Sequence, residues 1–191
     1  MIEDNDKTYN IAIAGYGGQG VLTIGLLIAR AGLKVYNNAS WFPTYETWQR
    51  GGRVFCGVVL SDNEIISPII SEPETLIVLD EPALDLYEDS LISDGLLVYN
   101  NSMIKRKLKR DDIKSISIPA TALANEMKAV QVSNLILLGV FLKVMNIIPV
   151  DVILETLSDT LQKDKKEMFV SLNQRALKCG YDQEVDIVES A

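Results

Sequence analysis

The feature that most constrains this chain is a glycine-rich turn at residues 15–20, between a strand-like and a helix-like segment. The preceding residues, Tyr9–Ala14, form a nearly continuous run of small and branched apolar side chains. Such a run is typical of a strand covered on both faces, as in a parallel sheet. The following residues, Val21–Ala31, are apolar around most of a helix and precede Gly32, a residue type that commonly ends helices. This order of strand, tight turn and buried helix predicts an α/β fold.

The rest of the chain alternates between short apolar runs and turn residues. These runs predict further strands at Leu33–Tyr36, Arg53–Leu60, Thr75–Leu79, Leu96–Tyr99 and Ile113–Ile118. We expect Asn37–Gly52 to form a long loop and Glu64–Ser67 to pair with the strand at Arg53–Leu60 as a hairpin. Helices are expected after Pro119, at Asn134–Asn146 and beyond Pro149. The economical interpretation is one doubly wound, Rossmann-like α/β domain over residues 1–191, with a mostly parallel sheet and an inserted β-hairpin.

Composition excludes most self-contained catalysis. The 191 residues include no histidine, so a Ser-His-Asp triad, an imidazole acid–base group and a histidine metal ligand are all excluded. The two cysteines, Cys56 and Cys179, cannot by themselves ligate an iron–sulfur cluster or a structural zinc ion. We expect both to be buried thiols in a reducing compartment. Neither a catalytic residue nor a metal site is therefore assigned to this chain.

Charge and hydropathy indicate a soluble protein that avoids nucleic acid and membranes. The net charge is −8, and residues 61–100 carry ten acids and no base. The basic run Lys105–Arg110 is expected to be a solvated surface segment or, alternatively, a contact for an acidic partner. No secretory signal is recognised at the N-terminus, and the most apolar stretch, Leu135–Ile148, is shorter than the roughly 20 residues of a membrane span. A cytoplasmic location is expected.

The glycine turn has several possible uses. Gly15, Gly17, Gly18, Gln19 and Gly20 can form a tight turn whose helix N-terminus offers N–H groups to a phosphate. Binding of NAD(P) requires an acid or an arginine after the second strand, and residues 36–40 hold neither. A Walker A loop is also excluded, because no lysine follows the last glycine. A purely structural turn and the docking of another phosphate, cofactor or partner backbone both stay open.

A second loop combines aromatic residues, an arginine and paired glycines. Tyr45 is followed by Arg50, Gly51 and Gly52. The guanidinium group of Arg50 can offer a planar fork to a carboxylate or phosphate, and the glycines allow another chain to approach closely. In the alternative interpretation, Trp48 fills the core and Arg50 pairs with an acid of the same chain.

Taken in order, these motifs resemble the gamma subunit, or gamma domain, of 2-oxoacid:acceptor oxidoreductases, typically ferredoxin-dependent, of the pyruvate, 2-oxoisovalerate and 2-oxoglutarate types. Any one of these matches is unspecific, but the ordered set is specific. The matching segments are Gly15–Val21, Tyr45 with Arg50-Gly51-Gly52, Ser61-Asp62 with Ile65-Ile66-Ser67-Pro68, Pro119-Ala120-Thr121, Asn134 with Leu138-Gly139, and Asn173 with Ala176-Leu177 and Gly180.

The resemblance implies a division of labour among subunits. It implies that thiamine diphosphate and iron–sulfur clusters lie in alpha, beta and delta partner subunits, and that coenzyme A is a co-substrate of the complex. It also implies oxidative decarboxylation of a 2-oxoacid to an acyl-CoA, with electrons passing to ferredoxin. This chain would then assemble the complex and help to hold coenzyme A.

Two other classes of function are weighed against the gamma subunit. The first is a free-standing, Rossmann-type nucleotide-binding enzyme, which the missing acid counts against. The second is a scaffold or regulatory module whose glycine turn only packs. For the gamma subunit, we expect the glycine turn and the Tyr45–Gly52 loop to lie on one edge of the sheet, because both follow the carboxyl ends of strands.

Overall fold

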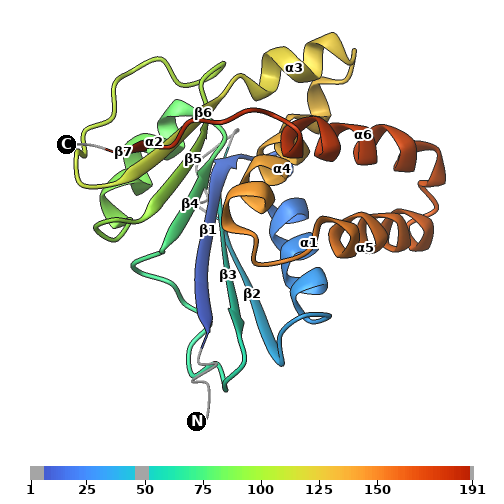
Figure 1. Ribbon diagram of the computed structural model, residues 1–191, viewed down its shortest axis with the longest axis horizontal. Coiled ribbons are helices and arrows are strands. Elements are labelled where there is room, and N and C mark those ends of the chain that lie inside the picture. Colours follow the sequence, from blue (N-terminus) through green and yellow to red (C-terminus); the bar gives the residue numbers. More distant parts are fainter. Residues whose placement is uncertain (1–6, 46–51, 190–191) are drawn as a thin grey trace.

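A seven-stranded sheet forms the centre of the computed structural model, which describes residues 7–45 and 52–189 (Figure 1). The strands are β1 (Thr8–Tyr16), β2 (Asn38–Tyr45), β3 (Arg53–Ser61), β4 (Thr75–Val78), β5 (Leu96–Asn100), β6 (Lys114–Ile118) and β7 (Val188–Glu189). Their order in the sheet is β2-β3-β1-β4-β5-β6-β7. Strands β1, β4, β5 and β6 are parallel, whereas β3 is antiparallel to both of its neighbours and β7 to β6. The expected mostly parallel α/β sheet is confirmed.

Helices cover both faces of this sheet. They are α1 (Val21–Gly32), α2 (Glu81–Tyr87), α3 (Ala120–Glu126), α4 (Ser133–Met145), α5 (Val150–Lys163) and α6 (Val170–Tyr181), with short 3-10 turns at Glu88–Ser90, Val130–Val132 and Glu167–Phe169. Figure 1 shows α1, α4, α5 and α6 gathered on one side, and α2 beside β4 and β5 on the other. The chain is therefore doubly wound, as expected.

Strand β1 separates two apolar cores. Ile11 and Ile13 point into the larger core, which α1 and α4 share, whereas Ala12 and Ala14 point into the smaller core beneath α2. All four side chains are at most 1% exposed. Because neighbouring side chains alternate between the two faces, a strand covered on both sides must be apolar throughout.

Helices α4 and α6 cross at two glycines. A Cβ atom added to Gly139 would overlap the carbonyl oxygen of Leu177, and one added to Gly180 would overlap that of Ile136. The crossing thus depends on the absence of both side chains, since packed backbones leave no room for a methyl group. This contact gives a physical reason for two of the glycines in the ordered motif set.

The prediction of a second strand at Leu33–Tyr36 was wrong. Residues 33–36 form turns that continue from α1, with amide hydrogen bonds from Leu33 to Ala29 and from Tyr36 to Gly32. Leu33 and Val35 are exposed, so the apolar run does not mark a buried strand. The segment 37–52, expected to be a loop, instead begins with strand β2. The Asn, Ser and Pro residues of β2 are untypical of a strand, but its Trp41 packs on the face that α1 covers.

The expected hairpin also has a different partner. Strand β3 pairs with β2 and with β1, and residues 64–67 form no strand. The inserted hairpin of this fold is therefore β2–β3. Pro43 fits in β2 because that strand lies at the edge of the sheet, where a missing N–H group costs little.

Candidate functional site

The glycine turn leaves the carboxyl end of β1 and begins helix α1. Gly18 and Gly20 have positive φ angles of 94° and 77°, which side-chain-bearing residues rarely adopt. The side chain of Gln19 closes the turn, because its Oε1 atom accepts a hydrogen bond of 2.6 Å from the Tyr16 amide. Among the described residues no side chain caps α1, and the first turn of this helix contains no acid. The helix N-terminus therefore keeps its partial positive charge for another group.

Asn134 fixes the turn against helix α4. It is 5% exposed, donates from Nδ2 to the Gly20 carbonyl at 3.3 Å, and accepts at Oδ1 from the Leu135 amide at 2.9 Å. A Cβ atom on Gly20 would overlap the Asn134 amide. The Asn134 of the motif set is thus a positioning residue for the turn.

The described ends of the second loop lie beside the glycine turn. Tyr16 is paired with Arg53, and Tyr45 with Val54. The Gly17 amide donates to the Gly52 carbonyl at 3.1 Å. The expectation that both loops leave the same edge of the sheet is confirmed by these described ends. Arg50 and Gly51, like residues 46–49, lie outside the described residues.

Two cavities flank the turn and share Gly18. The larger, of about 330 Å³, is lined by Tyr16, Gly17, Gly18, Gly20, Val21, Leu22, Thr23 and Val54. The smaller, of about 180 Å³, is lined by Gly18, Gln19, Leu79, Asn100, Met103, Thr121, Val130, Gln131 and Ser133. None of these lining residues carries a charge. Both cavities can therefore bind a ligand through backbone and neutral polar groups, and their described walls offer no carboxylate, ammonium or guanidinium group.

Asn100 organises the floor of the smaller cavity. It is 2% exposed, donates to Thr121 Oγ1 at 2.8 Å, and accepts from the Ser102 and Thr121 amides. These bonds join the end of β5 to the start of α3. They explain the Thr121 of the motif set, whereas Asn100 itself was missed by the sequence analysis.

Asp80 is a second residue that the sequence analysis missed. It follows β4, the parallel neighbour of β1, and caps α2 by accepting from the Ala83 amide at 3.0 Å. Its side chain is buried, and its Oδ2 atom has no hydrogen-bond partner among the described residues. Burial raises the pKa of this carboxyl group, opposed by the Ala83 amide and the nearby Tyr16, Gln19 and Arg53. The helix-start pattern Asp-Glu-Pro was the signal for it.

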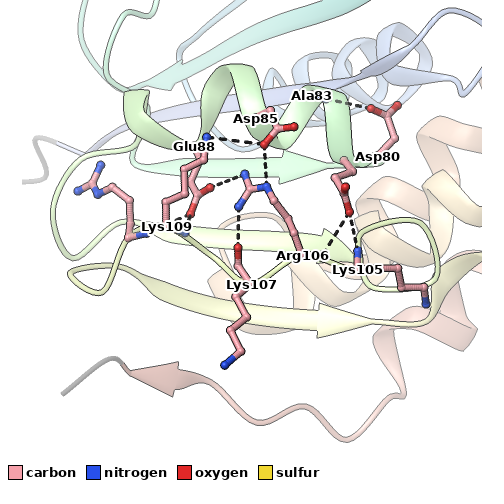
Figure 2. Close-up of polar contacts among 10 residues, drawn as sticks. Asp80, Ala83, Asp85, Glu88, Lys105, Arg106, Lys107 and Lys109 are labelled. Carbon is pink, nitrogen blue, oxygen red and sulfur yellow. Dashed lines mark hydrogen bonds and ion pairs between the residues drawn. The ribbon is translucent and has the colours of Figure 1, made fainter.

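The basic run 105–110 lies at the surface, as expected, with Lys105, Lys107 and Lys109 exposed, but its two arginines are paired with acids of the same chain. Figure 2 shows the Arg106 guanidinium between Asp85 and Glu88, with Nε 2.7 Å from Asp85 and Nη2 2.5 Å from Glu88. Glu88 is 1% exposed and also accepts from the amides of Lys109 and Arg110. Two acids of 61–100 thus hold Arg106 and two backbone amides of this segment within the chain.

The two thiols are not poised for chemistry. Burial raises the pKa of the Cys56 thiol to about 12, with Trp41 opposing the shift, and burial also raises the pKa of Cys179. Cys56 is buried, as expected, and Cys179 is half-buried. Across residues 7–45 and 52–189, no three Asp, Glu or Cys side chains are grouped so that they could hold a metal ion.

The strand order differs from that of a classic dinucleotide-binding fold. There, the second strand lies directly beside the first and carries the ribose-binding acid at its end. Here β3 separates β2 from β1, and residues 36–40 precede most of β2 instead of following it. The sequence test for an acid was thus applied at the wrong position, but the separation of the two strands itself disfavours that mode of binding.

The site defines a class of protein: an α/β domain that presents a glycine turn and an uncapped helix at the carboxyl edge of its sheet. Residues 10–183 match the family model "Pyruvate ferredoxin/flavodoxin oxidoreductase". The chain belongs to this family, and its resemblance to the gamma subunits is confirmed. None of the helices in the described parts is long and apolar enough to span a membrane.

Two curated relatives illustrate the family. Ketoisovalerate oxidoreductase subunit VorA of Methanothermobacter marburgensis is 31% identical over 92% of this chain, which spans 36% of that protein. The 2-oxoglutarate synthase subunit KorC of Methanocaldococcus jannaschii is 29% identical over 90% of this chain and 91% of its own length. The chain therefore spans about a third of VorA and nearly all of KorC.

Solved structures share the fold. The 2-oxoglutarate:ferredoxin oxidoreductase of Magnetococcus marinus, with 2-oxoglutarate, coenzyme A and succinyl-CoA bound, has a TM-score of 0.82 at 24% identity, over 91% of this chain and 30% of its own. The keto/oxoacid ferredoxin oxidoreductase gamma subunit of Geobacter sulfurreducens has a TM-score of 0.78 at 22% identity, over 92% of this chain and 95% of its own.

Proposed function

We propose that this chain is the gamma component of a cytoplasmic 2-oxoacid:ferredoxin oxidoreductase, and that residues 1–191 form one gamma-type domain. In this proposal, alpha, beta and delta subunits bring thiamine diphosphate and iron–sulfur clusters, as the resemblance implies. The complex converts a 2-oxoacid, coenzyme A and oxidised ferredoxin to an acyl-CoA, carbon dioxide and reduced ferredoxin. The thiamine cofactor supplies the carbanion chemistry of that reaction.

Within the complex, the glycine turn holds the phosphates of coenzyme A. The observation that carries this assignment is the uncapped N-terminus of α1, with no acid in its first turn, open to a cavity of about 330 Å³. Backbone N–H groups and a helix N-terminus are the groups that bind phosphate. The similar oxidoreductase of Magnetococcus marinus was solved with coenzyme A bound, which supports this choice of ligand.

The residues proposed for this role are those of the sequence analysis. Gly15, Gly17, Gly18, Gln19 and Gly20 shape the turn, and Gly52 is hydrogen-bonded to it. The proposal also assigns Tyr45, Arg50 and Gly51 to this role, with the Arg50 guanidinium as a fork for a phosphate or for a carboxylate of a partner. None of them is assigned an acid, base or nucleophile, so the role is to bind and to orient.

Co-expression with the partner subunits tests the function. We expect the native chain to co-purify with them, and the complex to reduce ferredoxin only when 2-oxoacid and coenzyme A are both present. A complex prepared without this chain should lose that activity. A chain that stays alone in the presence of those subunits, or a complex that is fully active without it, would contradict the proposal.

A further inference from the structure

On the face of the β2–β3 hairpin opposite α1, Phe55 packs against Tyr87 of α2, and a loop covers Gly57. Helix α1 lies on the other face, where Gly25 meets Cys56 and Gly32 meets Leu60. Gly57 lies between Cys56 and Val58 in β3, so it points to the face opposite α1. There the space above Gly57 is filled by Ile70, from the loop of residues 62–74 that joins β3 to β4.

Hydrogen bonds order parts of the 62–74 loop. Asn38 donates from Nδ2 to the Asn63 carbonyl at 2.9 Å, and the Asn63 amide donates to Ser61 Oγ at 3.0 Å. Farther along, the Ile69 amide donates to Ser67 Oγ at 3.2 Å. The Asn63 bonds thus tie the start of the loop to the hairpin, and Ile70 anchors the loop over Gly57.

This arrangement places apolar side chains in water. Ile66 is 98% exposed and Ile69 is 66% exposed. Phe42, which is 38% exposed, is paired with Gly57 across the hairpin and therefore shares the face that Ile70 covers. Isolated exposed apolar residues are ordinary, but Ile66 and Ile69 belong to the short loop that Ile70 anchors on the face of Phe42, and exposed apolar residues grouped in this way are typical of an interaction surface.

The charges around this face select the kind of partner. The 62–74 loop contains Asp62, Glu64, Glu72 and Glu74, and it contains neither Lys nor Arg. Glu64 and Glu72 are exposed. A second copy of this chain would bring the same acids to the contact, where like charges repel, whereas a basic rim would complement them.

We propose that the 62–74 loop and Phe42 form the docking surface for another protein subunit of the oxidoreductase. The surface of that subunit has an apolar centre, which receives Ile66 and Ile69, and a rim of Lys and Arg that faces Glu64 and Glu72. This inference rests on the proposed function, because it assumes that the chain works in a complex. It concerns a face of the sheet different from the glycine turn, and it gives a role to the Ile65–Pro68 motif that the ligand site leaves unused.

The test compares double variants in the co-expressed complex. Ile66→Ser/Ile69→Ser should weaken association at least tenfold, without a change in the thermal unfolding of the free chain, because both side chains are exposed. Met168→Ser is the matched control, since Met168 is 82% exposed and lies between α5 and α6. Glu64→Lys/Glu72→Lys should weaken association at low salt, and the loss should shrink as salt is added.

Hydrogen exchange of the native complex provides the second readout. Residues 62–74 should exchange more slowly in the complex than in the free chain. A complex that is active but leaves this exchange unchanged, or associates normally with both serines, overturns the inference and leaves the proposed function standing. Failure of the native chain to associate overturns both. If the serine variant instead abolishes a dimer of the free chain, the occupant is a second copy and the proposal is wrong.

Discussion

Two irregular stretches of this chain, residues 15–20 and residues 105–110, differ in what satisfies their polar groups. In 105–110, the Arg106 guanidinium and several amides are bonded to carboxylates of the same chain. In 15–20, one glutamine side chain closes a backbone turn, and cavities lie on both sides of it. The comparison teaches that many charges do not by themselves indicate a binding site. The two arginines of the charged segment are paired within the chain, whereas the neutral turn has hydrogen-bonding capacity to offer.

The largest expected effect is a loss of stability when the acids that hold the 105–110 segment are removed. Glu88→Ala leaves Arg106 and two backbone amides without their buried acceptor, and should lower the free energy of unfolding by about 3–5 kcal/mol. Urea denaturation measures this loss. Glu155→Ala is the control, because its ion pair with Lys34 is exposed and should cost less than about 1 kcal/mol. Equal losses in both variants would show that 105–110 is not held by Glu88.

The next effect is on the neutral turn. Gly20→Ala places a methyl group against the Asn134 amide at a positive φ angle, and should cost about 2–4 kcal/mol of stability. Adding Asn134→Gly to Gly20→Ala should recover the stability lost through the overlap, but not the stability lost through the positive φ angle. A double-mutant cycle in urea measures the coupling. Strict additivity of the two changes would contradict the described contact.

A smaller effect concerns the pH dependence that Asp80 introduces. Because burial raises its pKa in the folded state, Asp80 favours folding most below its ordinary pKa of 3.8, and this contribution is lost as pH rises through the folded value. Asp80→Asn should therefore gain stability relative to the native chain as pH rises from about 4. Urea unfolding of both chains across pH 3–7 measures this, and parallel curves would contradict it.

Asp80→Ala is the companion variant. It removes the cap of α2 as well as the carboxyl group, and its free energy of unfolding should lie about 1 kcal/mol below that of Asp80→Asn at neutral pH. Stability equal to that of the asparagine variant would show that the Ala83 hydrogen bond contributes little.

The smallest expected effect is an absence of binding. Calorimetry of the free chain with NADH or NADPH should give no heat of binding at micromolar concentrations, because β3 separates β2 from β1. Micromolar affinity for either nucleotide would restore the free-standing enzyme as the better interpretation.

Much of the fold and part of the site could be predicted from the sequence. Long apolar runs such as Tyr9–Ala14 have one physical use, a strand buried on both faces, and were placed correctly. The glycine turn was found because its residue types permit few other conformations. The strand β2 was missed, because an edge strand needs no continuous apolar run and tolerates Pro43.

The remaining parts depend on contacts between distant residues. Glu88 and Arg106 lie on opposite sides of β5 in the sequence, so a local interpretation of 105–110 found the exposed lysines but missed the ion pair that holds Arg106. Asn100 lines the site and is bonded to Thr121, and the spacing of these two residues in the sequence does not predict that bond. Asp80 left a helix-start signal, but its position beside the turn follows from the strand order.

The central claim is that the neutral turn binds coenzyme A while charged residues elsewhere stabilise the fold. The most direct test is steady-state kinetics of the assembled complex with Gly18→Ala, where the positive φ of 94° strains the turn without an overlap. Asn146→Ala is the control, since Asn146 also has a positive φ but lies at the far end of α4. We expect KM for coenzyme A to rise about tenfold with kcat within about twofold in the Gly18 variant only. An unchanged KM in an intact complex would contradict the claim.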